Sequence, residues 1–349
     1  MNAPLRAENR HMTKPKLAII PGDPSGIGPE LVARLLTSDG VREAADILLV
    51  GDTHIWEQGA RQAGVTLPLD PISQADVVGF SGLRQLEMET IDAADVKIAQ
   101  VTTPGGTSAL RTLDRALDLA VAGHVDGVLF GPFNKAALTA AGLNAEDEHR
   151  YMARYLGFEG YHSEINVLDE LMTTRVTSHI GLRDVAANIT ADGVRKAITM
   201  AHDTLAKAGK ARPHVAVAAL NPHAGDNGKF GREEIDILAP VVAEYQGRQM
   251  HVTGPWPSDT VFLKAKAGEV DAVVTMYHDQ GQIAIKLMGF DRGVTVAGGL
   301  PIPVATPAHG TAFDIAGQGI ANVGATRSAF DLLVRLAVTQ RDTRPAPIQ

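Results

Sequence analysis

KLAIIPGDPSGIGPE, residues Lys16–Glu30, is the stretch that decides the fold. Its first five residues form a short apolar run that is typical of a buried strand, so Lys16–Ile20 is predicted as a strand. Glycines and prolines then interrupt regular structure, and Pro29 suits the start of a helix that we expect near Glu30. A strand, a Gly-rich loop and a helix in succession indicate an α/β protein.

The same alternation continues along the chain. Further strands are predicted at Ile47–Val50, Gly127–Phe130, Arg175–Ser178, Val215–Leu220 and Ala272–Met276. Helices are predicted at Thr53–Gly64, Thr107–Ala122, Asp192–Ala208, Glu233–Tyr245 and Asp259–Lys266. Such alternation favours parallel strands that are joined by crossover helices.

Composition limits the classes of function. The length of 349 residues suits two lobes that share a cleft better than one core. A formal charge of −8 at pH 7 argues against a general nucleic-acid binder, which would normally carry a basic surface. The chain contains no cysteine, which excludes disulfides, thiolate zinc sites and a cysteine nucleophile. Any metal site must therefore use His, Asp or Glu side chains.

Targeting segments are not evident in the sequence. Residues 1–16 are polar and lack the apolar core of a signal peptide, so we interpret them as a flexible leader. No run of about 18 apolar residues occurs, so no membrane span is predicted. We therefore expect a cytoplasmic protein with no membrane partner.

Four polar, Gly-rich loops follow predicted strands. They are Pro21–Glu30, Gly131–Lys135, Asn221–Gly231 and Tyr277–Gly281. Ligands of open α/β sheets bind outside the carboxyl ends of the strands, so we expect the four loops to share one cleft. None of them matches GxGxxG, so a standard Rossmann fingerprint is absent.

Three histidines stand at or near predicted strand ends, namely His179 in TSHIGLRD, His223 in NPHAGDNG and His278 in MYHDQG. Neutral imidazole is a common ligand of zinc, and three ligands leave a position open for substrate. The spacing alone is equally compatible with capping or core histidines. Asp279 follows His278 and can orient its imidazole or contact a cofactor, and it can cap a helix at the same time.

Basic side chains provide further candidates. Lys135 ends the GPFNK loop and is a candidate acid or base for a nearby alcohol, although a solvated surface lysine would have the same pattern. Lys286 and Arg292 form a local basic pair that suits a phosphate or a carboxylate. Ordinary surface charge is the alternative for that pair.

At these residues the sequence resembles the 4-hydroxythreonine-4-phosphate dehydrogenase family, the PdxA-like proteins. The matching blocks are PGDPSGIGPE, GPFNK, TSHIGLRD, LNPHAGDNGKFGREEID, GPWPSDT, MYHDQGQIAIK, GFDRGV and HGTAFDIAG. The resemblance implies an α/β/α fold like that of isocitrate and isopropylmalate dehydrogenases, with two lobes and a central cleft, in a homodimer whose active site lies at the interface. Residues 17–145 and 297–349 would form a cofactor-side lobe, and residues 146–296 a lobe for metal, substrate and dimerisation.

The resemblance also implies roles for residues. His179, His223 and His278 would bind the divalent metal, zinc first and magnesium, manganese or cobalt as alternatives. Substrate would contact His149, Arg150, Lys286, Arg292 and Thr295, while NAD would bind through loops whose residues we do not assign. A histidine–threonine pair of the family appears here as His149–Arg150, an asparagine as Thr295 and an arginine as Val304.

Arg150 favours a carboxylate or phosphate over an ammonium group, so the chain is more similar to the second PdxA-like subgroup. That subgroup oxidises 4-phospho-D-threonate or 4-phospho-D-erythronate at C3 and releases CO₂ to give dihydroxyacetone phosphate. We expect Lys135 and Asp279 to be the catalytic residues of this reaction. Alternatives are the vitamin B6 step on 4-hydroxythreonine phosphate, a cis-dihydrodiol dehydrogenase, and an acyl-phosphate transferase of the same broad fold.

Overall fold

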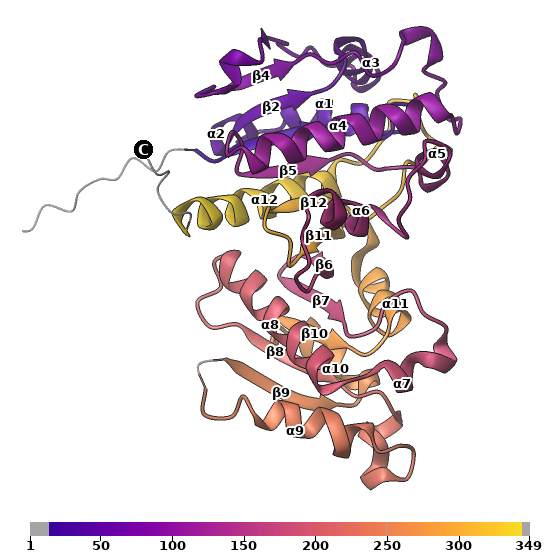
Figure 1. Ribbon diagram of the computed structural model, residues 1–349, viewed down its shortest axis with the longest axis vertical. Coiled ribbons are helices and arrows are strands. Elements are labelled where there is room, and N and C mark those ends of the chain that lie inside the picture. Colours follow the sequence, from indigo (N-terminus) through magenta and orange to yellow (C-terminus); the bar gives the residue numbers. More distant parts are fainter. Residues whose placement is uncertain (1–13, 249, 344–349) are drawn as a thin grey trace, which may run out of the picture.

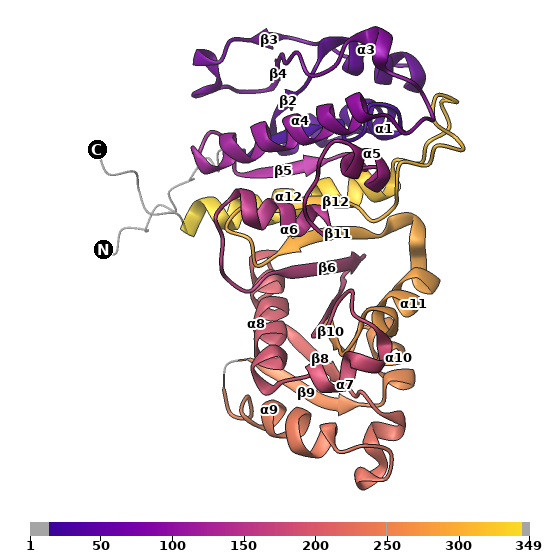
Figure 2. The ribbon, with the colours of Figure 1, turned by 45° about the vertical axis from the view of Figure 1, so that its right-hand side comes forward.

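A single sheet of twelve strands runs through the whole molecule (Figure 1). The computed structural model describes residues 14–248 and 250–343. Most of the predicted leader, residues 1–13, lies outside the described residues, as do residues 344–349. Figures 1 and 2 show an upper and a lower lobe joined by the middle strands of the sheet.

The upper lobe contains the first half of the sheet. In spatial order its strands are β3 (Pro71–Ile72), β4 (Leu83–Leu86), β2 (Asp46–Val50), β1 (Lys16–Ile20), β5 (Gly127–Phe130) and β12 (Val304–Pro307). Its helices are α1 (Gly28–Leu36), α2 (Val41–Ala44), α3 (Thr53–Ala63), α4 (Thr103–Val121), α5 (Lys135–Ala140) and α12 (Gly324–Thr343). Helix α6 (Glu148–Tyr155) is tied to α4 by hydrogen bonds from Tyr151 to Asp114 and from Tyr155 to Asp118.

The lower lobe continues the same sheet. Its strands are β11 (Val294–Gly298), β6 (Ser163–Leu168), β7 (Leu171–Arg175), β10 (Ala272–Thr275), β8 (His214–Ala218) and β9 (His251–Trp256). Its helices are α7 (Val185–Asn188), α8 (Ala191–Lys207), α9 (Ala239–Ala243), α10 (Ser258–Lys266) and α11 (His278–Gly289).

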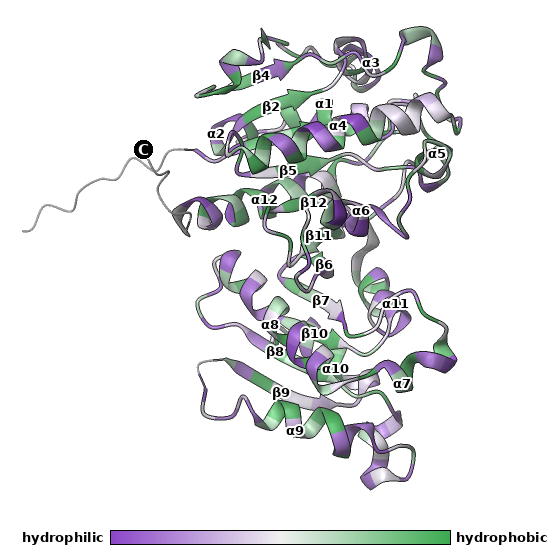
Figure 3. Ribbon diagram, viewed as in Figure 1, coloured by the Kyte–Doolittle hydropathy of each residue, from purple (hydrophilic) through white to green (hydrophobic). Residues whose placement is uncertain are grey.

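Strand β1 shows why the central strands are apolar throughout. Leu17 and Ile19 pack into the core cluster that contains residues of α1 and α12, whereas Ala18 and Ile20 pack into the cluster that contains residues of α4. Because successive side chains of a strand point to opposite faces, a strand covered on both faces needs apolar residues at every position. Figure 3 shows β2 as almost wholly hydrophobic, while α4 alternates between hydrophobic and hydrophilic turns.

The predicted elements of the upper lobe agree with the structure more closely than those of the lower lobe. The bounds predicted for β1 and β5 are those observed. The predicted strand Arg175–Ser178 is wrong, because β7 ends at Arg175 as the second arm of a hairpin with β6. The predicted helix Glu233–Tyr245 begins as a π-helix at Glu234–Leu238 and continues as α9.

The expectation of a parallel sheet is wrong at its centre. Strand β11 is antiparallel to both of its neighbours, β12 and β6, and β6 is antiparallel to β7. The parallel group around β1 therefore runs in the opposite sense to the parallel group around β10. A sheet twists by about 20–25° between neighbouring strands, so the five steps from β5 to β10 change strand direction by on the order of 100°. Loops that follow strands of the β1 group and of the β10 group can therefore meet, although they do not leave the same edge of the sheet.

Within residues 14–248 and 250–343, no helix combines the length and apolar content that crossing a lipid bilayer requires.

Candidate active site

The cavity that contains His179 and His278, which we call the main cavity, lies where the two lobes meet and has a volume of about 250 Å³. Side chains of β6, β11, β12, α6 and α11 line it, together with the GPFNK loop. Its titratable side chains are Lys135, Glu148, Glu164, His179, His278, Lys286 and His309. Two lysines, two glutamates and three imidazoles in one small cavity are enough for proton transfer and for binding an anion.

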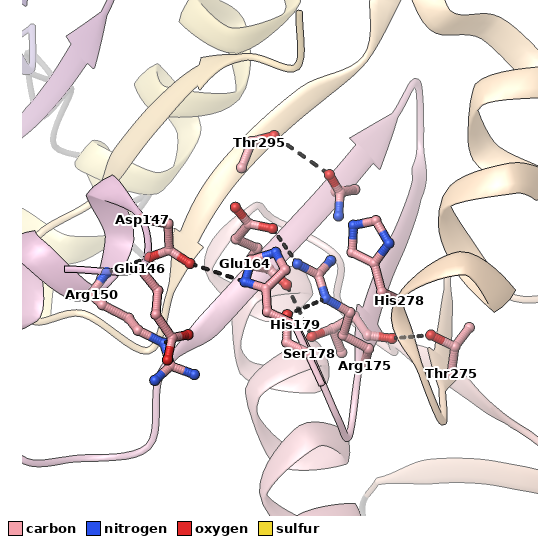
Figure 4. A network of polar contacts seen from close by, with 12 residues as sticks. Glu146, Asp147, Arg150, Glu164, Arg175, Ser178, His179, Thr275, His278 and Thr295 are labelled. Atoms are coloured by element: carbon pink, nitrogen blue, oxygen red, sulfur yellow. Dashed lines mark hydrogen bonds and ion pairs between the residues drawn. The ribbon is translucent and has the colours of Figure 1, made fainter. Parts of the chain in front are cut away.

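His179 and His278 come together in this cavity, with ring centroids 5.7 Å apart. Nδ1 of His179 lies 3.4 Å from a carboxylate oxygen of Asp147, and Nδ1 of His278 lies 2.7 Å from one of Asp279 (Figure 4 shows the first pair). A carboxylate against Nδ1 fixes the ring and leaves Nε2 as a possible ligand, which is the usual environment of a metal-binding histidine. These two rings therefore fit a divalent cation.

Asp279 lies inside the first turn of α11, since that helix begins at His278. The cap interpretation of Asp279 is therefore wrong. Its contact with the imidazole of His278 agrees with the other interpretation, that it orients the ring.

A polar network holds the segment that carries His179 (Figure 4). Arg175 is 3% exposed, forms an ion pair with Glu164 and donates a hydrogen bond of 2.9 Å to Ser178. Asp147 caps α6 by accepting a hydrogen bond of 2.8 Å from the backbone N–H of Arg150, while its other oxygen faces His179. The network joins β6, the end of β7 and the start of α6, so three elements fix the position of one imidazole.

His223 is placed differently. It lies in the turn Pro222–Gly228, where residues His223–Asn227 all have left-handed backbone angles, with φ between 44° and 83°. Buried Glu234 supports this turn by accepting hydrogen bonds of 2.8 Å from the backbone N–H groups of Leu220 and Asn221. The His223 ring is exposed and lies 6.4 Å from that of Phe230, and it does not line the main cavity.

The described part of one chain therefore assembles two of the three predicted metal ligands. Among residues 14–248 and 250–343, no three His, Asp or Glu side chains lie close enough to hold an ion. The turn with His223 follows β8, which pairs with β10, the strand that precedes His278.

The predicted substrate residues are divided among three places. Lys286 and Thr295 line the main cavity, where Lys135, the predicted acid or base, is exposed. Arg150 lines a neighbouring pocket of about 310 Å³ and forms an exposed ion pair of 3.2 Å with Glu146. Arg292 lines neither pocket, and its guanidinium contacts both oxygens of Asp169 at 3.1 and 3.2 Å.

His149 is 5% exposed and lines both the neighbouring pocket and a narrow recess beside the main cavity. Among the described residues, none forms a hydrogen bond with its buried Nε2, and burial lowers the pKa of the imidazole to about 4. The ring is therefore neutral near pH 7. Val304 is fully buried and lines a narrow recess of the cavity together with Glu148 and Thr295.

The expectation that four loops share one cleft is only half right. Gly131–Lys135 and Tyr277–Gly281 contribute to the main cavity, whereas Pro21–Glu30 and Asn221–Gly231 do not. Pro21–Glu30 packs against the Gly131–Lys135 loop, and the backbone N–H of Asp23 donates a hydrogen bond to the carbonyl of Pro132. One loop of each parallel group reaches the cavity, because β5 and β10 lie nearer the centre of the sheet than β1 and β8.

Sequence reasoning missed the acidic side chains of the site, Asp147, Glu148 and Glu164. Asp147 and Glu148 stand in the run EDE directly before His149, and this clustering of carboxylates beside a histidine was the available signal. Glu164 belongs to none of the motifs discussed above. It lies in β6, which was not predicted as a strand because its sequence, SEINVL, mixes polar and apolar residues.

A protein-family model described as pyridoxal phosphate biosynthetic protein PdxA matches residues 43–333. A Pseudomonas aeruginosa relative named "Putative 4-hydroxythreonine-4-phosphate dehydrogenase 2" is 49% identical over 340 residues, which cover 96% of this chain and 98% of the relative. The D-threonate 4-phosphate dehydrogenase of Cupriavidus necator is 36% identical and covers 93% of this chain and 98% of its own length. A crystal structure of 4-hydroxythreonine-4-phosphate dehydrogenase from Klebsiella pneumoniae matches with a TM-score of 0.80 at 33% identity, over 93% of this chain and 98% of that one.

Proposed function

The chain belongs to the PdxA family, and on that premise we propose that it is a metal- and NAD-dependent dehydrogenase of a phosphorylated four-carbon hydroxy acid. The proposed substrate is 4-phospho-D-threonate or 4-phospho-D-erythronate, and the group oxidised is its C3 hydroxyl. The name of the Cupriavidus necator relative supports this substrate class. A cytoplasmic location, a homodimer and no membrane or nucleic-acid partner are parts of the same proposal.

One observation carries the proposal. Two imidazoles, each with Nδ1 against a carboxylate, face a cavity that is also lined by Lys135 and Lys286. Oxidation of an alcohol needs a group that polarises the oxygen, a group that accepts its proton and a cation for the anionic ends of the substrate. The cavity contains candidates for each of these tasks.

We propose that His179, His223 and His278 hold the metal and that their imidazoles come together in the homodimer. Zinc suits imidazole ligands best, and manganese, cobalt or magnesium are the alternatives. The bound cation would supply Lewis-acid stabilisation of negative charge on the substrate oxygens.

Exposed apolar residues of the lower lobe support a homodimer. Ile283 and Leu287 of α11 are 61% and 84% exposed, and Leu182, which follows His179 closely in sequence, is 72% exposed. Clustered large apolar side chains on a surface commonly mark a protein interface. Because α11 begins at His278, a partner chain docked on this helix would lie close to the cavity.

The chain's own residues have distinct tasks in the proposed reaction. Lys135 would accept the proton of the C3 hydroxyl, and Asp279 would keep His278 oriented. Bound NAD would supply the acceptor for the C3 hydride, so that oxidation of the substrate would give a β-keto acid and NADH. The keto acid would then lose CO₂ and take up a proton at C2, which leaves dihydroxyacetone phosphate.

The anionic groups of the substrate need cationic or hydrogen-bonding partners. Lys286 and Thr295 line the main cavity and are proposed to contact substrate there. Arg150 and His149 border the neighbouring pocket, which we propose accepts one anionic end. Arg292 is proposed to reach the substrate only in the dimer, since within one chain it contacts Asp169.

The nearest alternative is the vitamin B6 step, in which the substrate carries an amine instead of the C2 hydroxyl. A screen of the two four-carbon acid phosphates and 4-hydroxythreonine phosphate, each with NAD and with NADP, separates the two functions. We expect NADH formation with a hydroxy acid, loss of activity with a chelator, and recovery on adding back zinc. Faster turnover of the amino substrate, or full activity in the chelator, would overturn the proposal.

A further inference from the structure

The main cavity contains a carboxyl group that the proposed reaction does not use, that of Glu148. Glu148 is the first residue of α6, and it lines both the main cavity and the narrow recess beside Val304. The other glutamate of the cavity, Glu164, is ion-paired with Arg175. Among the described side chains, none forms a hydrogen bond or ion pair with the carboxyl of Glu148.

A partly buried carboxyl without a side-chain partner is unfavourable in a cavity. Burial raises the pKa of Glu148, while a hydrogen bond from its own backbone N–H and the charge of nearby Lys135 lower that pKa less strongly. A carboxylate can accept about four hydrogen bonds, so a ligand that donates one to a partly buried carboxylate recovers free energy lost on burial. The position of Glu148 thus favours a ligand that brings a hydrogen-bond donor.

The neighbours of Glu148 indicate which part of a substrate lies against it. The preceding residue, Asp147, contacts the imidazole of His179, and Lys135 is close enough to lower the pKa of Glu148. Under the proposed function, the carbons that bear hydroxyl groups lie near His179 and Lys135. A phosphate or carboxylate would be repelled by ionised Glu148, whereas a hydroxyl can donate to it.

We propose that Glu148 is a specificity-determining residue whose carboxylate accepts a hydrogen bond from the hydroxyl on C2, next to the carbon that is oxidised. This inference rests on the proposed function. The two candidate substrates differ in configuration at C2, so an acceptor fixed on one side of that carbon distinguishes between them. Glu148 is held at the start of α6, and that helix is capped by Asp147 and tied to α4 by two tyrosines.

The test compares the wild-type dimer with Glu148→Gln and Glu148→Ala on three substrates, namely 4-phospho-D-threonate, 4-phospho-D-erythronate and the 2-deoxy analogue 3-hydroxy-4-phosphobutanoate. We expect kcat/KM for the preferred 2-hydroxy substrate to fall about tenfold or more in Glu148→Ala, because a hydrogen bond to a charged group is lost. For the 2-deoxy analogue, which lacks the donor, we expect a change of less than about twofold. The preference between the two C2 epimers should shrink in parallel.

Glu146→Gln is the matched control. Glu146 stands two residues earlier, is exposed and pairs with Arg150, and it lines no part of the main cavity. Its substitution should leave the ratio of kcat/KM between the 2-hydroxy and 2-deoxy substrates unchanged. An equal loss for both substrates in the Glu148 variants would overturn the proposal, and so would no loss for either.

Calorimetric binding of the same three compounds to the zinc-loaded dimer without NAD provides a readout that does not depend on turnover. We expect Glu148→Gln to weaken the 2-hydroxy ligand selectively, with a melting temperature like that of the wild type. Should Glu148→Ala fold poorly, Glu148→Gln and Glu148→Asp test the same contact with less change in volume. Failure of the wild type to oxidise any of the compounds would instead refute the proposed function. The binding data would still test the hydrogen bond between Glu148 and the C2 hydroxyl.

Discussion

The ends of β7 and β10 and the turn after β8 each carry a histidine that we propose as a metal ligand, but they present it differently. His179 and His278 lie 5.7 Å apart, and each has a carboxylate at Nδ1. His223 is exposed on a turn of five successive left-handed residues. The first region orients its imidazoles through side-chain contacts, and the second orients its imidazole through the backbone.

The difference shows where the molecule stores strain. A left-handed residue other than glycine costs roughly 1–2 kcal/mol, and four of the five residues in the turn are not glycine. Buried Glu234 offsets part of this cost by accepting hydrogen bonds from the backbone before the turn. Strained backbone that is kept in place by a buried carboxylate commonly marks a functional position. The turn therefore fits the role that we propose for His223, as a metal ligand in a homodimer.

The largest expected effect is on kcat, and it tests whether His223 shares one metal site with His179 and His278. Alanine at His179, His223 or His278 should each lower kcat by about a thousandfold or more, because Lewis-acid stabilisation is worth several kcal/mol. Metal content per subunit, measured with NADH formation, should fall in all three variants. If His223→Ala keeps both metal and activity while the other two lose them, only the paired histidines are ligands.

A pH experiment tests His149, the buried histidine that lines the neighbouring pocket. Burial lowers the pKa of His149 to about 4, so the unfolded chain takes up a proton that the folded chain does not. Stability should therefore fall as pH drops from about 6.5 to about 4, by up to about 3 kcal/mol from this residue. His149→Gln should remove that dependence.

The measurement is chemical denaturation of both proteins across this pH range. Burial raises the pKa of Asp23 to about 6, which contributes with the opposite sign in the same range, but it is common to both proteins. The difference between the two curves therefore reports on His149, and parallel curves would contradict the assignment of a neutral, buried imidazole.

A smaller effect tests the turn. Glu234→Gln keeps the size of the side chain but removes the charge that accepts hydrogen bonds from Leu220 and Asn221, so we expect a loss of about 2 kcal/mol in the free energy of unfolding. Denaturant titration measures the loss. The neighbouring Glu233→Gln, whose carboxylate contacts only the side chain of Asn221 among the described residues, should cost less. Equal losses would show that the turn does not depend on Glu234.

The smallest expected effect concerns the paired histidines. Asp279 is exposed and contacts Nδ1 of His278, so Asp279→Asn should weaken metal binding by roughly tenfold. Competition with a chromophoric chelator measures this affinity. Asp279→Glu should bind metal more tightly than Asp279→Asn, and identical affinities would mean that the carboxylate does not orient the ring.

The sequence by itself determined the upper lobe and the chemistry available to the site. Strands β1 and β5 were predictable because both of their faces are covered, so apolar residues fill every position. The histidines near strand ends and the absence of cysteine limited any metal site to imidazole and carboxylate ligands. The positions of Lys135 and Lys286 also followed from motifs, and both side chains line the main cavity.

Tertiary structure decided the centre of the sheet and the membership of the site. The middle strands β6 and β11 mix polar with apolar residues, so local periodicity did not reveal them or their antiparallel pairing. The contact between Asp147 and His179 joins residues from two different elements, and the neighbouring Glu148 enters the cavity by the same placement of α6. Such contacts depend on how the sheet twists and reverses direction between the lobes, which is a property of the whole chain and not of any short segment.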